Sequence, residues 1–234
     1  MQNPYAAPGA GFGTPFAFIA PSDYAPLGWR TTMDGLAIAS TPVFLFLFEL
    51  LQMTSAKDGD DEDGSLLVAL LDLVSRLGLL LTFVAAAVFF SIWLHRAVRN
   101  LRGLGRTGME FTPAGAVASF YIPFVFWVRP YRVLTELWRA SDPAPECAER
   151  GWAGYGTTTA LVSVYWGFWV AWYFLETILG RIDEPKLSAG IGLAASALLA
   201  VAAVTCIQMM RGVVARQEAA AARLAILQTL NRGL

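Results

Sequence analysis

The sequence predicts an all-α fold: a polytopic membrane helical bundle with four transmembrane helices, an interfacial or re-entrant cytoplasmic segment and a C-terminal amphipathic helix. Hydrophobic residues make up 56% of the 234-residue chain and charged residues only 15%, whereas about 25% of an ordinary soluble domain is charged. Several apolar runs reach the roughly 20 residues that a helix needs to cross a bilayer. The arginines gather in particular connections, and this distribution sets the orientation of the spans.

The first element is a leader of residues 1–29 that is rich in proline and glycine. No cationic segment precedes an apolar core there, so we expect no cleavable signal peptide. The composition is typical of a flexible leader. Phe12, Phe16 and Phe18 leave open a second interpretation, a docking arm that binds a partner through aromatic anchors.

Four membrane spans are predicted. They cover about residues 33–53, 73–94, 156–179 and 187–210. The second apolar run begins near Leu66, but 20 residues counted back from His95 reach only Ser75. This placement puts Asp72 and Arg76 at the opposite headgroup level and keeps Arg76 away from the bilayer centre, where a charge is costly.

A further apolar stretch, residues 113–128, is predicted not to cross the bilayer. It is short, and Pro123 interrupts it. Arginines stand on both sides of it, at positions 96, 99, 102 and 106 and at positions 129, 132, 139 and 150. Cytoplasmic connections are enriched in Lys and Arg, so both flanks belong on the same side of the membrane. We therefore predict an interfacial or re-entrant segment, with both termini in the cytoplasm.

Residues 211–234 are predicted to form a cytoplasmic helix after the fourth span. Its apolar residues Val213, Ala220, Leu224 and Leu227 recur near one face. Arg216 and Arg223 lie away from that face, which is typical of an interfacial or partner-binding helix. A plain extension of the fourth span is the alternative.

Short motifs follow one another in the connection between the second and third spans. They are Trp93 with Arg96 and Asn100, Leu104-Gly105, Phe111-Thr112-Pro113, Ile122-Pro123, Arg129-Pro130-Tyr131, and Leu-Trp-Arg-Ala-Ser-Asp-Pro at 137–143. This series resembles the core of a bacterial membrane family catalogued as domain of unknown function 4328. The resemblance is close over about residues 80–145 and loose in the four-span frame around them. It implies a polytopic bacterial membrane domain and brings no established activity, cofactor or catalytic residue.

The same connection is predicted to form a lipid- or partner-binding surface, which we call the inner platform. Its residues are Trp93, Arg96, Arg99, Arg102, Trp127, Arg129, Tyr131, Arg132, Trp138 and Arg139. Tryptophan and tyrosine suit the headgroup region, and each basic residue near an anionic leaflet contributes about 1 kcal/mol of attraction. Anionic headgroups are therefore the expected ligand. Arginines that only set the orientation are the alternative.

A second set of charged residues, Glu49, Asp72, Arg76 and Glu176, lies near the outer ends of the spans. Asp72 and Arg76 are four residues apart, so they can pair on one helix face. We expect structural ion pairs here. An ion or proton pathway is the alternative, because ionisable residues in spans are functional candidates. No second acidic layer continues such a path through the middle of the bilayer.

No pattern in the sequence indicates an enzyme, a cofactor or a metal site. Cys147 and Cys206 lack a CxxC or metal-ligand spacing, and the glycine-rich pieces lack the context of a nucleotide-binding loop. A net charge of −1 gives no reason to expect nucleic acid as a partner.

The leading hypothesis for function is a non-catalytic accessory or scaffold subunit of the bacterial inner membrane. It would hold other membrane subunits, or a second copy of itself, through the inner platform, the small-residue face of the fourth span and the terminal helix. One alternative is a small transporter or channel component that uses the outer-side carboxylates. A second is a lipid-handling enzyme that uses His95 and Asp34.

Overall fold

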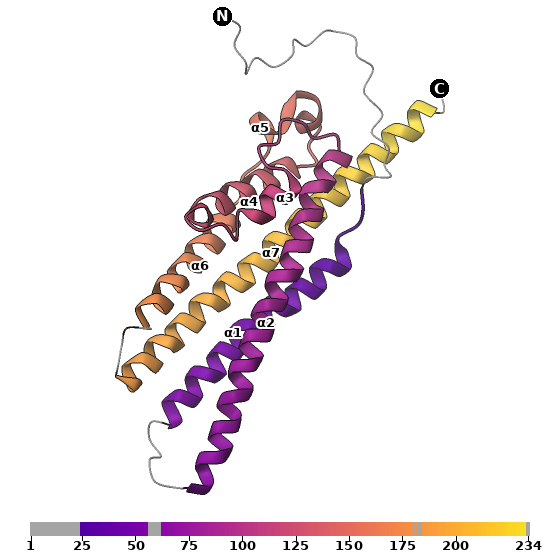
Figure 1. Ribbon diagram of the computed structural model, residues 1–234. Helices are drawn as coiled ribbons and strands as arrows, with labels where there is room; N and C mark the ends of the chain where they lie inside the picture. The colour runs from indigo at the N-terminus through magenta and orange to yellow at the C-terminus, as the bar shows by residue number, and fades with distance from the viewer. Residues whose placement is uncertain (1–23, 56–61, 180, 182–183, 233–234) are drawn as a thin grey trace, which may run out of the picture.

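The computed structural model describes residues 24–55, 62–179, 181 and 184–232, and this part of the chain is all-helical (Figure 1). The long helices are α1 (Gly28–Ser55), α2 (Glu62–Gly103), α6 (Ala160–Leu179) and α7 (Pro185–Arg232). The short elements between α2 and α6 are α3 (Pro113–Ala118), the 3₁₀ turn η2 (Val125–Trp127), α4 (Arg129–Ala140), the π turn η3 (Cys147–Gly151) and α5 (Trp152–Tyr155).

The long helices form an elongated bundle (Figure 1). α1 packs on both α2 and α7, and α6 packs on α7. α2 returns antiparallel to α1, and α7 returns antiparallel to α6 (Figure 1). The end of α2, the short elements and the last turns of α7 therefore share one end of the molecule, which we call the arginine end.

Three of the described helices contain segments that are long and apolar enough to cross a membrane: Gly28–Met53, Leu66–Gly103 and Leu187–Asn231. They contain the first, second and fourth predicted spans. The third predicted span forms the 20-residue helix α6, which is not among these three segments. The all-helical membrane class is thus confirmed with three candidate spans.

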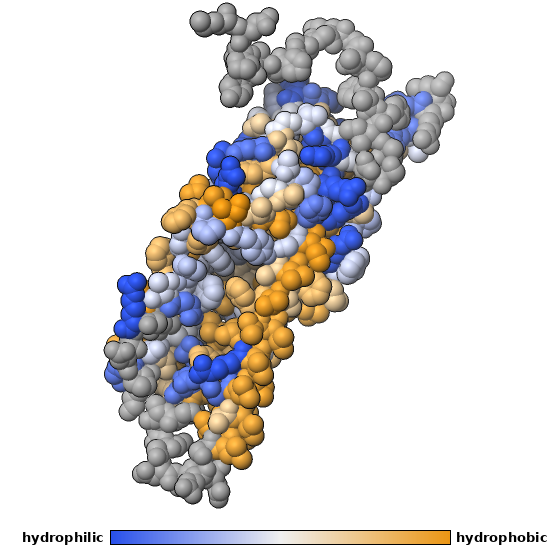
Figure 2. All heavy atoms as spheres, viewed as in Figure 1, coloured by the Kyte–Doolittle hydropathy of each residue, from blue (hydrophilic) through white to orange (hydrophobic). Residues whose placement is uncertain are grey.

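Large apolar side chains cover the outside of the bundle along α2. Figure 2 shows hydrophobic atoms along the length of this helix, and Leu81, near its middle, is 67% exposed. Such a continuous apolar surface is costly in water. In a bilayer, lipid tails cover it and the helices associate through side-chain packing.

The tightest core lies at the arginine end. Leu101 of α2, Leu134 and Leu137 of α4, and Met210 and Val213 of α7 are fully or almost fully buried against one another. Pro130 stands in the first turn of α4, where its missing N–H is tolerated and its fixed φ suits the start of a helix. Its buried residues recur at helical spacing, so one face closes on α2 and α7.

α7 continues without a break from its apolar part to Arg232. The predicted C-terminal helix is therefore a continuation of the fourth predicted span. Val213 and Ala220 are buried, but Ile226, Leu227 and Leu230 in the last turns are 60%, 47% and 60% exposed. The apolar face of α7 thus extends beyond the residues that cover it.

Residues 113–128 form α3, a turn and η2 in place of a continuous helix. Thr112 caps α3 by accepting a hydrogen bond from the Gly115 N–H at 3.1 Å. Beyond α3 the segment reaches along the bundle: the Trp127 ring lies 5.1 Å from that of Tyr173 in α6, between centroids. Phe124, at the turn between α3 and η2, is 87% exposed and has a φ of 65°.

Candidate interaction site at the arginine end

The structure divides the inner platform into buried and exposed residues. Trp93 is fully buried in the core, so it stabilises the bundle and is not a surface aromatic. Trp138 is partly buried, and the Arg216 guanidinium lies 4.6 Å from its ring centroid. Trp127 packs on α6, with its ring 5.3 Å from that of Phe174. The rings of these three aromatic residues pack against other residues of the protein, so their main role is in the fold.

Two arginines of the platform are held by neighbours. Arg139 donates hydrogen bonds to the carbonyl oxygens of Gly156, at 3.3 Å, and of Ala153. Arg132 is exposed and forms an ion pair of 2.8 Å with Glu110. Both interactions fix the connection between α2 and α6.

The remaining platform residues lie mainly at the surface. Arg99 and Arg102 on α2, and Arg129 and Tyr131 on α4, are exposed, whereas Arg96 is partly buried. The Tyr131 hydroxyl lies 3.2 Å from the Ser163 Oγ of α6. The cationic surface of the arginine end therefore comes from helices whose opposite faces are anchored in the core.

A buried polar network, which sequence reasoning missed, anchors these helices. Gln217 of α7 donates from Nε2 to the Ala97 carbonyl of α2 at 3.0 Å and to the Ser141 Oγ after α4 at 3.1 Å. Its Oε1 accepts a hydrogen bond from Asn100 Nδ2 at 3.2 Å. Asn100 also exchanges two hydrogen bonds with the backbone of Ala25, before α1. One amide side chain thus connects α7 to α2 and α4.

The second half of the buried polar network centres on Asp142. Its Oδ2 lies 2.6 Å from the Arg216 Nη2 and accepts hydrogen bonds from the Thr157 N–H and hydroxyl at 2.9 and 2.6 Å. Its Oδ1 accepts the Ala144 N–H at 3.0 Å. Burial alone would raise the pKa of Asp142, but the hydrogen bonds from Thr157 and Ala144 and the Arg216 charge outweigh it and hold this pKa below its ordinary value.

Arg106 completes the buried polar network from the loop after α2. It donates to the carbonyl oxygens of Ala140 at 3.0 Å and Asp142 at 2.5 Å. The side chain is almost fully buried, and this burial lowers the pKa of its guanidinium. The network therefore joins α2, α4, α7 and the segment before α6. The bonds of Asp142, Arg106 and Arg216 in it are charge-assisted, and such bonds are stronger than neutral ones.

A close approach between helices accompanies the network. A Cβ at Gly212 of α7 would lie 2.6 Å from the Trp138 ring of α4. Any side chain at this position would displace the ring. Gly212 is therefore needed for its small size, which lets α7 approach the Trp138 ring, and not for its backbone flexibility.

The outer set of charged residues separates into two parts. Asp72 and Arg76 form an ion pair of 2.8 Å on α2, and Gln52 of α1 donates to Asp72 at 2.9 Å. Glu49 is instead buried against Gly192 of α7.

Glu176 of α6 accepts a hydrogen bond from the Trp172 Nε1 at 3.1 Å. Its carboxylate is also near enough to that of Glu49 for the two like charges to repel each other. Asp72 and Arg76 are brought together, whereas the two glutamates lie on the α6 and α7 side of the bundle. The transport alternative stays a prediction.

The described part of the chain holds no group of residues arranged as a metal site. No three His, Cys, Asp or Glu residues lie together there as a metal site. Cys147 and Cys206 are buried and unbonded to each other. Asp34 is fully buried in α1, whereas His95 is exposed on α2, so the structure gives this pair no common surface.

The fold and the arginine end with its buried polar network define a class of protein. It is an all-helical protein with helices of membrane-spanning length, and its short helices gather at one end, the polar cap. The chain belongs to the family described as Domain of unknown function (DUF4328), whose model matches residues 60–216. This confirms the resemblance and extends it from the start of α2 to Arg216. No curated protein and no solved structure matches the chain.

Proposed function

We propose that the protein is a non-catalytic accessory or scaffold subunit of the bacterial inner membrane. It holds a partner membrane protein or a second copy of itself, and it binds anionic headgroups at its arginine end. The observation that carries this proposal is the exposure of Ile226, Leu227 and Leu230 on the last turns of α7. These side chains form an apolar stripe beyond the core, and exposed apolar patches mark interaction sites.

The proposal includes four crossings, with α6 as the third. α6 has 20 residues, about 30 Å of helix, which matches the hydrocarbon core. Four crossings put the segment before α1, the α2–α6 connection and the end of α7 on one side. The arginines of this end favour the cytoplasm for that side.

Residues 113–128 then form a re-entrant segment in the inner leaflet. Tyr121 donates to the Ala87 carbonyl of α2 at 3.1 Å, and Trp127 packs on α6, so the segment lies against protein. Irregular backbone at membrane depth requires such protein cover. The exposed Ile122 and Phe124 at the turn point away from the core, and lipid would cover them.

The buried polar network supports this role because it holds the cytoplasmic surface rigid. A binding surface on fixed elements loses little conformational entropy when a partner binds. Arg99, Arg102 and Arg129 remain exposed on these fixed helices, where each can attract an anionic headgroup by about 1 kcal/mol.

The direct test is affinity purification of the full chain after crosslinking in native membranes. We expect a defined partner, or a crosslinked dimer of the chain, that is lost in the double variant Ile226→Ser/Leu230→Ser. The matched control is Ala222→Ser/Ala225→Ser, which changes two exposed small residues on the same turns. A lone monomer in the wild-type sample, or equal capture by both double variants, would contradict the proposal.

A further inference from the structure

A groove follows the seam between α1 and α7 and has two compartments. The apolar compartment has a volume of about 390 Å³. It is lined by Ala39, Pro42, Val43, Phe46, Leu193, Ser196, Ala197, Ala200, Ala203, Val204 and Ile207. The polar compartment has about 280 Å³ and is lined by Gly28, Thr31, Thr32, Arg211, Val214, Ala215 and Glu218.

Helical spacing places both compartments on the same face of each helix. On α1 the lining residues run from Gly28 through Thr32 and Ala39 to Phe46, and on α7 from Leu193 through Ile207 to Glu218. Along each helix the lining residues recur every three or four positions, as residues on one helix face do. The one gap in this series is at Gly35 of α1, which lines neither compartment. Ile207 packs on Gly35 at the junction. The two compartments therefore lie end to end along one seam, on either side of this contact, and we call them together the α1–α7 groove.

The change in polarity coincides with the expected membrane boundary. The residues that line the apolar compartment lie within the predicted spans 33–53 and 187–210, whereas those that line the polar compartment, within 28–32 and 211–218, lie outside them. From Leu193 to Ile207 the groove is about 21 Å long at 1.5 Å per residue. This length suits one acyl chain of a phospholipid.

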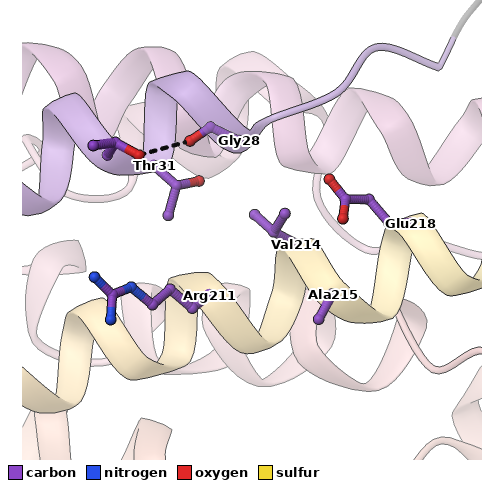
Figure 3. Close-up of a pocket in the computed structure, with 7 residues that line it drawn as sticks. Gly28, Thr31, Arg211, Val214, Ala215 and Glu218 are labelled. Carbon is purple, nitrogen blue, oxygen red and sulfur yellow. Dashed lines mark hydrogen bonds between the residues drawn. The ribbon is translucent and has the colours of Figure 1, made fainter.

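The polar compartment carries one charge of each sign. Figure 3 shows Arg211 and Glu218 at opposite ends of the opening, with Thr31 and Val214 between them. Arg211 is exposed and forms no ion pair with any described residue. Thr31 and Thr32 donate their hydroxyls to the backbone of α1, so Arg211 is the donor available to an anion. Glu218 disfavours a second anion and suits an ammonium group.

We propose that the α1–α7 groove binds one zwitterionic aminophospholipid. Its phosphate contacts Arg211, its ammonium group faces Glu218, and one acyl chain lies along Ala197 and Ala200. This site uses neither the inner platform nor the last turns of α7, so it goes beyond the proposed scaffold function. Failure to find a protein partner would leave the lipid test unaffected.

Native mass spectrometry of the full chain in detergent tests the proposal with three lipids of equal acyl chains. We expect wild type to retain one phosphatidylethanolamine in preference to phosphatidylglycerol and phosphatidylcholine. Arg211→Gln should weaken retention of phosphatidylethanolamine about tenfold, the usual scale for a charge-assisted contact. Glu218→Gln should remove the preference over phosphatidylglycerol, and Ala197→Phe should block the apolar compartment and prevent retention.

Two matched variants serve as controls. Arg150→Gln removes an exposed arginine of η3 at the same end that belongs to neither the inner platform nor the groove, and Ala194→Phe enlarges an exposed alanine of α7 that does not line the groove. Both should retain phosphatidylethanolamine as wild type does. Equal losses in Arg150→Gln and Arg211→Gln, or in Ala194→Phe and Ala197→Phe, would overturn the proposal. A wild-type preference for phosphatidylglycerol that Arg211→Gln abolishes would do so as well.

Discussion

Asp142→Ala is expected to destabilise the arginine end by about 3 to 5 kcal/mol, the usual cost of removing one partner from a buried ion pair. The side chains of Asp142 and Arg216 are only 8% and 19% exposed. The substitution would leave the Arg216 guanidinium without its carboxylate. It would also remove the acceptor of the Ala144 N–H and of both Thr157 donors. Melting in detergent can be followed with a thiol-reactive fluorophore, because Cys147 is buried beside this cluster.

The control is Glu110→Ala, which breaks the exposed Arg132–Glu110 pair and should cost at most about 1 kcal/mol. Both variants are compared in a Cys206→Ala background, so that the fluorophore can react only with Cys147. Because the pKa of Asp142 is held below 3.8, its contribution is fully present above that pH and is lost as the pH falls through the lowered value. Equal melting temperatures for the two variants would show that the Asp142 pair does not hold the cap.

Gln217→Leu is expected to cost about 3 kcal/mol, although leucine has a similar volume. Gln217 is fully buried, and the substitution would leave the Ala97 carbonyl without this donor, and Asn100 and Ser141 without their amide partner. Each buried polar group that loses its partner costs about 1 to 3 kcal/mol. In a chain of this size, we expect a fall in melting temperature of roughly 6 to 12 °C.

Gln208→Leu is the matched control for Gln217→Leu. Gln208 is exposed two to three turns earlier on the same helix, so the change should shift the melting temperature by little. Equal melting temperatures for the Gln217→Leu and Gln208→Leu proteins would mean that the buried polar network does not stabilise the fold.

The parts of the fold that follow from local pattern could be predicted from the sequence. Runs of apolar residues predicted the helices around residues 33–53, 73–94, 156–179 and 187–210, because length and hydropathy are properties of one segment. The pairing of Asp72 with Arg76 follows from helical spacing alone. The continuity of α7 to Arg232 could not be decided in the same way, because a change from apolar to polar surface does not end a helix.

The buried polar network could not be predicted because its partners are far apart in the sequence. Asn100 and Gln217 are both polar residues in otherwise apolar faces, a pattern that also occurs in exposed helices. Arg216 was expected to point away from the apolar face, yet the folding back of the α2–α6 connection places Asp142 in front of it. Trp93 was assigned to the surface for a similar reason, since tryptophan suits both headgroups and cores.

We propose that the α2–α6 connection returns to the side of the membrane from which it started. Arg102 and Arg132, on either side of residues 113–128, are both exposed. Each can be replaced by cysteine in a Cys147→Ala/Cys206→Ala background and labelled with a membrane-impermeant maleimide. We predict that both positions react in inverted inner-membrane vesicles and that neither reacts in intact spheroplasts. Labelling of one position only in vesicles and of the other only in spheroplasts would contradict the account.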